Sequence, residues 1–266
     1  MTERRALDGR TVVVTRAAEQ AGPFVALLEG AGARVVQAPA IVIEPPASWA
    51  PLDAALAELR RFTWILFTSV NGVAMVDRRL RDVGRRWADL DGARIGAIGP
   101  ATAAALAAHG ATVEVVPDEY RAEGLVARLR ARVGPGDRIL LPRAAQTRDV
   151  LVSELRGLGP EVIEVPAYRT RAAGEAAIAV RAALAGAAVD AVTFTSSSTA
   201  RSFARLFSDA ERRAWFSGVT VASIGPVTAA TAAEYGLVTA VMPSEYTIPA
   251  LARALADHFA ERTPKE

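Results

Sequence analysis

The chain has no cysteine, one lysine and two histidines among its 266 residues. Without a thiol it can form no disulfide, thiolate nucleophile or cysteine-bound iron–sulfur cluster. His109 and His258 are its only imidazoles, which argues against zinc chemistry. Lys265 is next to the last residue, so Schiff-base and Walker-type phosphate chemistry both lack their essential lysine. We therefore expect a site that uses no metal, no cofactor and no lysine.

Long hydrophobic runs are also missing. No apolar segment reaches the roughly 18 residues that a membrane-spanning helix needs, and the first ten residues are polar rather than signal-like. Hydrophobic residues make up 51% of the chain and charged residues 23%, as in a folded globular protein. The length favours two compact domains over one. We expect a cytoplasmic protein that binds neither membrane nor nucleic acid, and a monomer satisfies everything in the sequence.

Almost all of the positive charge comes from arginine, and the formal net charge is +2. Arginine is permanently charged and can hold a carboxylate or phosphate through two hydrogen bonds. An anionic ligand is compatible with this composition. Codon bias would produce the same excess of arginine on solvated helix faces, and we assign most of the individual arginines to that explanation.

The sequence repeats itself. Three motifs recur at an offset of 127 residues, the distance from Arg16 to Arg143, and two more recur at 126, the distance from Tyr120 to Tyr246. All five keep the same order, which chance does not explain, so the chain contains two copies of one unit. The paired segments are Val12–Ala18 with Ile139–Ala145, Ala33–Pro39 with Pro160–Pro166, Ile65–Ser69 with Val192–Ser196, Ile98–Ala104 with Ile224–Ala230, and Val116–Tyr120 with Met242–Tyr246.

Within each copy, short β-branched runs alternate with alanine-rich segments of helical length. This alternation predicts an α/β fold in which helices wrap parallel sheets. Glycines 32, 110, 159 and 236 stand where helices should end in a residue with positive φ. We expect strands near residues 11–15, 33–37, 64–67, 94–98, 112–116, 138–141, 161–165, 190–194, 219–224 and 238–241.

The duplicated motifs share one position, where a strand ends and a helix begins. Open α/β sheets bind ligands at that edge, because free N–H groups and the positive end of the helix dipole point outward there. Ordinary helix capping, worth about 1 kcal/mol, explains any single hydroxyl equally well, but its repetition in both copies favours an anion site. The candidate binding residues are Thr15, Arg16, Thr68, Ser69, Asn71, Gly99, Thr102, Arg143, Thr195, Ser196, Ser197, Gly225 and Thr228.

Tyr168 stands in a segment whose counterpart in the first copy carries the aliphatic Ile41. It could cover the flank of a domain, or it could give a proton to a departing hydroxyl. We expect His109 to lie at a helix C-terminus, where a cation is favoured. We expect His258 to face solvent.

In order and spacing, these motifs resemble the uroporphyrinogen-III synthase family over nearly the whole chain. The resemblance implies two flavodoxin-like lobes joined by a pair of strands, one lobe formed by residues 1–40 and 170–266 and the other by 41–169. Ala17 departs from the family, which often has proline there, and this affects the start of the helix. The motifs that carry the resemblance are Val14-Thr15-Arg16, Phe67-Thr68-Ser69 with Asn71, Ile98-Gly99-Pro100 with Thr102, Tyr168-Arg169-Thr170, Phe194-Thr195-Ser196, Ile224-Gly225-Pro226 with Thr228, and Glu245-Tyr246-Thr247.

The resemblance also implies a substrate and a reaction. The substrate would be hydroxymethylbilane, a linear tetrapyrrole with acetate and propionate groups, held in a cleft between the lobes. A cofactor-free lyase would remove the ring-A hydroxyl as water and close the ring through a spiro intermediate with ring D inverted, mainly by positioning. Tyr168 would be the proton donor, and Tyr246 and Thr247 would join the binding residues above. Transient contact with the preceding enzyme of the pathway fits this scheme.

Two other interpretations remain open on the sequence alone. The chain could be a two-lobed anion-binding or sensing module similar to periplasmic binding proteins, although it begins with no signal peptide. It could also be a degenerate homologue that keeps the fold without the activity. The isomer formed from hydroxymethylbilane distinguishes both from a working synthase.

Overall fold

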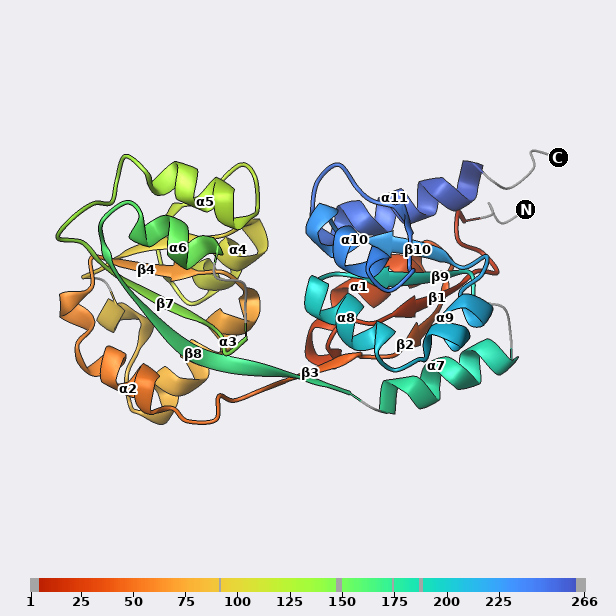
Figure 1. The fold of residues 1–266 in the computed structure, drawn as a ribbon, viewed down its shortest axis with the longest axis horizontal. Helices are drawn as coiled ribbons and strands as arrows, with labels where there is room; N and C mark the ends of the chain where they lie inside the picture. The colour runs from red at the N-terminus through yellow and green to blue at the C-terminus, as the bar shows by residue number, and fades with distance from the viewer. Residues whose placement is uncertain (1–4, 91, 147–149, 174, 187–188, 262–266) are drawn as a thin grey trace. The chain divides into compact units, whose positions relative to one another are not determined.

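The computed structural model describes residues 5–90, 92–146, 150–173, 175–186 and 189–261. Lys265 therefore lies outside the described residues. The chain forms two compact units, which we call unit 1 (Met1–Val42 with Arg171–Glu266) and unit 2 (Ile43–Thr170). Each has its own sheet, covered by helices on both faces (Figure 1), which is the α/β architecture that the sequence predicts.

Unit 1 is built on a five-stranded sheet in the order β11-β10-β9-β1-β2, in which every pairing is parallel. Its central strand β1 is buried on both faces: Val13 packs into one core cluster, and Val12 and Val14 pack into the other. Alternate residues of a strand point to opposite faces, so this all-apolar strand needs helices on both sides. Helices α7, α8 and α10 cover the first face, and α1 and α11 cover the second. The strands are β1 Thr11–Val14, β2 Arg34–Gln37, β9 Ala191–Phe194, β10 Thr220–Ser223 and β11 Thr239–Val241, and the helices are α1 Ala18–Gly30, α7 Glu175–Gly186, α8 Ser197–Ala204, α9 Asp209–Trp215, α10 Pro226–Ala233 and α11 Ile248–Glu261.

Unit 2 repeats this plan around the sheet β3-β8-β7-β4-β5-β6. Strand β4 alternates as β1 does, with Ile65 and Phe67 in one cluster and Trp64 and Leu66 in the other. Helices α2 and α3 cover the first of these faces, and α5 and α6 cover the second. The strands are β3 Ile41–Glu44, β4 Trp64–Phe67, β5 Arg94–Ala97, β6 Val113–Val115, β7 Arg138–Ala144 and β8 Glu161–Ala172; the helices are α2 Ala50–Ala57, α3 Val70–Asp82, α4 Pro100–Ala108, α5 Ala122–Leu129 and α6 Val150–Arg156, with short 3₁₀ turns at Leu59–Arg61 and Trp87–Leu90.

Strands β3 and β8 are neighbours in this sheet, and both run from one unit into the other (Figure 1). An ion pair of 3.0 Å between Arg169 and Glu44 joins them. The expected pair of connecting strands is thus present. Strand β8 continues seven residues beyond the predicted end at 165 because β3 and β7 flank it, a tertiary effect that the local sequence does not carry.

The predicted ends of the helices are confirmed. All four glycines expected at helix ends have positive φ, namely 101° at Gly32, 81° at Gly110, 102° at Gly159 and 78° at Gly236. His109 is the C-cap residue of α4, where its ring stacks on Trp87 with 5.1 Å between centroids.

The expectation that His258 faces solvent is wrong. It is only partly exposed, its Nε2 is shielded from solvent, and its ring lies edge-on against Phe259 at 5.3 Å. His258 lies three residues after the buried Leu255, so it borders the buried face of α11 and its ring packs against the protein.

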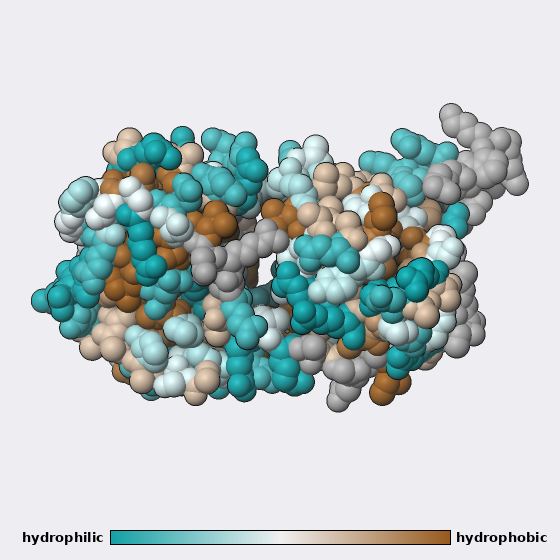
Figure 2. All heavy atoms as spheres, in the orientation of Figure 1, coloured by the Kyte–Doolittle hydropathy of each residue, from teal (hydrophilic) through white to brown (hydrophobic). Residues whose placement is uncertain are grey.

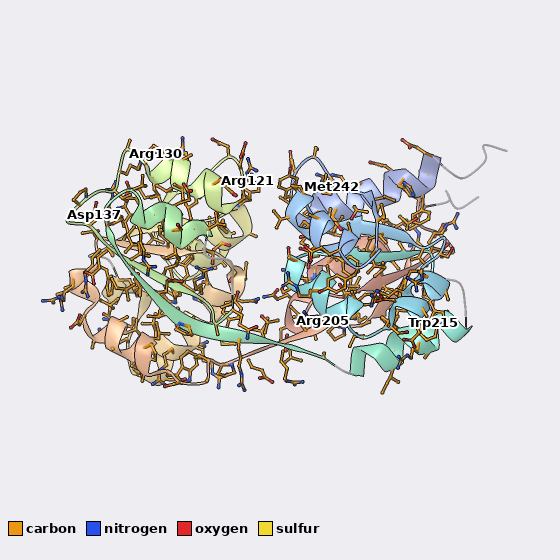
Figure 3. All side chains as sticks on the ribbon, viewed as in Figure 1. Arg121, Arg130, Asp137, Arg205, Trp215 and Met242 are labelled. Atoms are coloured by element: carbon orange, nitrogen blue, oxygen red, sulfur yellow. The ribbon has the colours of Figure 1, made fainter. Side chains whose placement is uncertain are left out.

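Several arginines lie exposed at the ends of helices. Arg121 and Arg130 mark the two ends of α5 and Arg205 follows α8, and all three are exposed (Figure 3). Hydrophilic residues cover much of the face drawn in Figure 2. Among the described residues there is no helix long and apolar enough to cross a membrane. That part of the chain also holds no cluster of three or more metal-type ligands.

Candidate functional site

At the edge of the unit 2 sheet where the parallel strands end, helix α3 starts directly after β4. Ser69 is the N-cap of α3, and its Oγ accepts a hydrogen bond of 3.0 Å from the backbone N–H of Gly72. A Cβ at position 72 would lie 3.3 Å from the carbonyl oxygen of Pro142, so glycine lets α3 start close against β7. This local packing fixes the position of the Ser69 hydroxyl.

Tyr168 reaches the same point from β8. It pairs with Ala144 at the end of β7, and it is only 7% exposed within the core cluster that contains Phe67. Its Oη lies 2.9 Å from Oγ of Ser69. Strands β8, β7 and β4 are adjacent in the sheet, so residues 99 positions apart in sequence meet at one edge.

The phenol of Tyr168 is protonated at neutral pH. Burial raises the pKa of Tyr168 above its ordinary value of 10.0, and this outweighs the lowering by hydrogen bonds with Ser69 and Asn71 and by the positive charge of Arg143. Tyr168 is therefore a buried O–H group with polar partners on one side, suited to donating a proton.

Arg143 is the cation of this edge. It is 7% exposed on β7, and its Nη1 donates to Oε2 of Glu164 at 3.1 Å. Glu164 also accepts from Nη2 of Arg156 at 3.4 Å. Unit 2 therefore balances its buried guanidinium with a carboxylate from its own sheet.

The equivalent edge of unit 1 is different. Arg16 follows β1 and is partly buried; its Nε is shielded from solvent without a partner, and no hydrogen bond or ion pair joins Arg16 to any residue in the described ranges. Burial lowers the pKa of Arg16. Thr15 is fully buried and donates its hydroxyl proton to the carbonyl of Thr193 at 2.6 Å. Thr15 thus joins two strands, and its hydroxyl is not offered to a ligand.

Hydroxyl groups gather at the next helix start of unit 1. Ser196 is the N-cap of α8 and accepts from the N–H of Thr199 at 3.2 Å, while its Oγ lies 2.9 Å from that of Ser198. Ser197 donates to the carbonyl of Val227 at 3.1 Å, which ties the start of α8 to α10. The predicted hydroxyl-rich edge therefore exists, and part of its hydrogen bonding is internal.

A protein-family model matches most of the chain. The model of the family described as uroporphyrinogen-III synthase HemD matches residues 22–253. The chain belongs to the uroporphyrinogen-III synthase family.

Two relatives in this family match along nearly their whole length. A uroporphyrinogen-III synthase of Synechococcus elongatus is 38% identical over 261 residues, which cover 97% of this chain and 98% of the relative. One from Chlorobaculum parvum is 29% identical over 250 residues, covering 93% and 98%. A mutant uroporphyrinogen III synthase from the extremely thermophilic bacterium Thermus thermophilus shares the fold, with a TM-score of 0.68 at 20% identity over 96% of this chain and 100% of that one.

The glycine of each Ile-Gly-Pro motif lies against a tyrosine ring. Gly99 and Gly225 are the N-caps of α4 and α10, each with extended backbone. A Cβ at either glycine would come within 3.2 Å of a tyrosine, Tyr120 in unit 2 and Tyr246 in unit 1. The sequence predicts Tyr246 as a binding residue, and the structure places Tyr120, its partner at the offset of 126 residues, in the equivalent position of unit 2.

The remaining predicted residues lie at the same two edges. Thr102 and Thr228 are buried in the first turns of α4 and α10. Thr68 and Thr195 are half-buried directly after β4 and β9. Thr247 accepts from the N–H of Ala250 at 3.3 Å just before α11.

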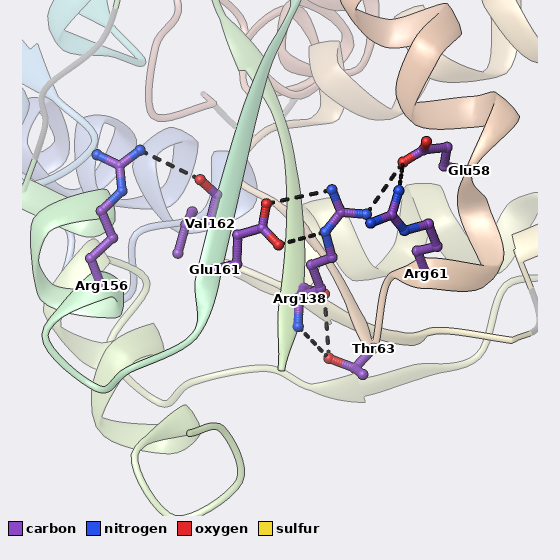
Figure 4. Close-up of polar contacts among 7 residues, drawn as sticks. All are labelled: Glu58, Arg61, Thr63, Arg138, Arg156, Glu161 and Val162. Atoms are coloured by element: carbon purple, nitrogen blue, oxygen red, sulfur yellow. Dashed lines mark hydrogen bonds and ion pairs between the residues drawn. The ribbon is translucent and has the colours of Figure 1, made fainter. Parts of the chain in front are cut away.

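The opposite edge of the unit 2 sheet, where the strands begin, is held by ion pairs. Arg138 at the start of β7 lies between Glu161 at 2.6 Å and Glu58 at 3.4 Å, and Arg61 and Thr63 complete the network (Figure 4). A groove of about 760 Å³ also lies on this side, lined by residues 57–61, Arg85 and residues 88–90. Tyr168, Ser69 and Arg143 lie at the other end of the strands.

Proposed function

We propose that the chain closes hydroxymethylbilane to uroporphyrinogen III and that Tyr168 gives its proton to the departing ring-A hydroxyl. The bond between the ring-A methylene carbon and the hydroxyl oxygen breaks, the pyrrole nitrogen supplies electrons to that carbon, and water leaves. The substituted carbon of ring D then attacks to form the spiro intermediate, which rearranges with ring D inverted. The proton that the tetrapyrrole loses at closure restores the phenol, so the balance is one water released.

The single observation that supports this role is the buried, protonated phenol held at 2.9 Å from Ser69. Ser69 Oγ already accepts from Gly72, and a hydroxyl has one proton and two lone pairs. When Ser69 donates its proton to Tyr168, the phenol proton is left for the substrate. A phenol with a raised pKa is a weak acid, which is adequate because the pyrrole nitrogen drives departure of the hydroxyl.

We assign carboxylate binding to the helix starts at the carboxyl edges of both sheets. Free N–H groups and short hydroxyls hold carboxylates there with modest energies per contact. Thr15 is omitted because its hydroxyl is used inside the sheet. Arg143 is omitted as well, because it is paired with Glu164. The proposed set is Arg16, Thr68, Ser69, Asn71, Gly99, Thr102, Thr195, Ser196, Ser197, Gly225, Thr228, Tyr246 and Thr247.

We further propose that the reaction needs no cofactor, because loss of water and carbon–carbon bond formation leave the oxidation state of the tetrapyrrole unchanged. The working form in this proposal is a cytoplasmic monomer that receives its substrate from the preceding enzyme through transient contact. Gel filtration with and without that enzyme tests the oligomeric state and the contact.

The test is the isomer produced from enzymatically generated hydroxymethylbilane. The wild-type protein is expected to give mostly the III isomer, whereas spontaneous closure gives no inversion. Tyr168→Phe is expected to lower kcat about 10²- to 10⁴-fold, the usual contribution of a positioned general acid, with product affinity little changed. Tyr235→Phe, a phenol beyond the end of α10, is the matched control and should leave kcat unchanged.

Two results would contradict the proposal. Wild-type product indistinguishable from spontaneous closure would leave a tetrapyrrole-binding module. Unchanged turnover in Tyr168→Phe would assign the proton to water or to the substrate's own carboxylates.

A further inference from the structure

Equivalent arginines of the two units have different surroundings. Arg16 and Arg143 are equivalent in the repeat. Arg16 stands two residues after Val14, and Arg143 stands two residues after Leu141. Val14 pairs with Gln37 in unit 1, and Leu141 pairs with Glu164 in unit 2. A neutral amide thus occupies, in unit 1, the position from which a carboxylate neutralises the arginine in unit 2.

The consequence is visible at both guanidinium groups. Arg143 is held by Glu164 at 3.1 Å. Arg16 has a solvent-shielded Nε without a partner and pairs with no acidic residue in the described part of the chain. A partly buried cation without a counter-charge is costly, and such a group is typical of a ligand site. Burial lowers the pKa of Arg16, and no acidic residue in the described ranges offsets this effect.

The helix that follows Arg16, α1, has no side-chain N-cap. Helix α1 starts after Ala17, and no side chain caps it, whereas Ser69 and Ser196 cap α3 and α8. The first-turn N–H groups of α1 therefore lack the side-chain acceptor that the other two helices have, and an anion beside Arg16 could accept from them.

We propose that Arg16 binds a carboxylate of the tetrapyrrole directly and that the neutral side chain at position 37 keeps this arginine available. Arg143, in contrast, is a positioning residue, committed to Glu164 and acting on Tyr168 through its charge. The assignment rests on the proposed synthase function for the identity of the ligand, while the lack of a counter-charge for Arg16 among the described residues rests on the structure alone.

Two substitutions test the proposed role of Arg16, one by removing its charge and one by adding a neighbouring carboxylate. Arg16→Gln removes the cation, and Gln37→Glu adds a carboxylate at the position equivalent to Glu164, opposite the strand residue that stands two before the arginine. Each is expected to raise KM for hydroxymethylbilane and the inhibition constant of uroporphyrinogen III by roughly 10- to 100-fold, the range for a lost charge-assisted contact, with kcat changed by less than about threefold. Gln37→Ala, which adds no charge, is the control and should leave both constants unchanged.

The double variant separates two ways in which Gln37→Glu could act. If the new carboxylate works by occupying Arg16, the combination with Arg16→Gln is no worse than Arg16→Gln alone. If it repels the substrate directly, the two effects multiply, and the proposed role of position 37 is overturned.

The role of Arg16 is overturned if Arg16→Gln leaves KM and the inhibition constant within about twofold of wild type. Failure of the synthase function is a separate result: the wild type would then make only the spontaneous isomer. In that case direct titration with uroporphyrinogen III still measures whether Arg16 and residue 37 control binding of a tetrapyrrole carboxylate.

Discussion

Units 1 and 2 carry the same motifs at the carboxyl edges of their sheets, yet the two edges do different things with them. In unit 2, Glu164 neutralises Arg143, and Tyr168 lies against the serine that caps α3. At the equivalent positions, the first copy has Gln37 and Ile41, and Arg16 is left without a carboxylate among the described residues. The two copies are similar scaffolds, and a few substitutions give unit 2 a buried phenol and leave unit 1 with an arginine that has no carboxylate partner among the described residues.

Removing the internal counter-charge of unit 2 should have the largest effect on stability. Glu164→Gln leaves Arg143 buried with a weaker partner, so the free energy of unfolding should fall by about 1.5–3 kcal/mol. Gln37→Ala at the matched position should change it by less than about 0.5 kcal/mol. Urea denaturation of both variants measures the difference. Equal effects would show that Glu164 does not balance Arg143 in a way that unit 1 lacks.

The two capping serines sharpen the same comparison. Ser69→Ala and Ser196→Ala should each cost about 1 kcal/mol of stability, the usual cost of a lost N-cap. Only Ser69 also contacts the phenol, so Ser69→Ala should lower kcat, by about tenfold for one hydrogen bond, whereas Ser196→Ala should act on KM. Thermal denaturation and steady-state kinetics of both variants test this. A fall in kcat for Ser196→Ala as large as for Ser69→Ala would remove the distinction.

Thr15 provides a smaller test within unit 1. Its hydroxyl joins β1 to the carbonyl of Thr193, and the repeat has Pro142 at the equivalent position. Thr15→Val should cost about 1–2 kcal/mol of stability through the lost buried hydrogen bond, with KM unchanged. A clear rise in KM without loss of stability would return Thr15 to the binding set.

The smallest expected effect concerns alkaline pH. The raised pKa of Tyr168 means that the folded protein holds the phenol proton more tightly than the unfolded chain does. This contribution is fully present below about pH 10, the ordinary pKa of tyrosine, and is lost as pH rises from there through the raised pKa. The stability difference between wild type and Tyr168→Phe should therefore shrink at about pH 11 relative to about pH 9. A constant difference would mean that the phenol is not shielded from ionisation.

Repetition in the sequence made most of the architecture predictable. Alternating patterns located every described strand except β3, which only the family resemblance implied. The glycines with positive φ ended their helices because only a residue without Cβ adopts that backbone readily. The length of β8 could not be predicted, since it depends on flanking by β3. Tyr168 and Ser69 were both named as candidates, but their contact required the order of β8, β7 and β4, which no local pattern encodes.

The sequence alone does not predict that Arg16 and Arg143 have different partners. The repeat matches Arg16 to Arg143, and likeness alone predicts one role for both. The difference lies in the partner strand and becomes meaningful only when the strand register places Gln37 opposite Val14 and Glu164 opposite Leu141, each two residues before its arginine. Differences between the copies of a repeat are therefore as informative as their similarities.

Steady-state kinetics of Tyr168→Phe and Arg16→Gln in one assay, after subtraction of spontaneous closure, test the division of roles between the units most directly. The division predicts that Tyr168→Phe lowers kcat with KM nearly constant and that Arg16→Gln raises KM with kcat nearly constant. The same change in both variants, or the reverse pattern, would contradict it.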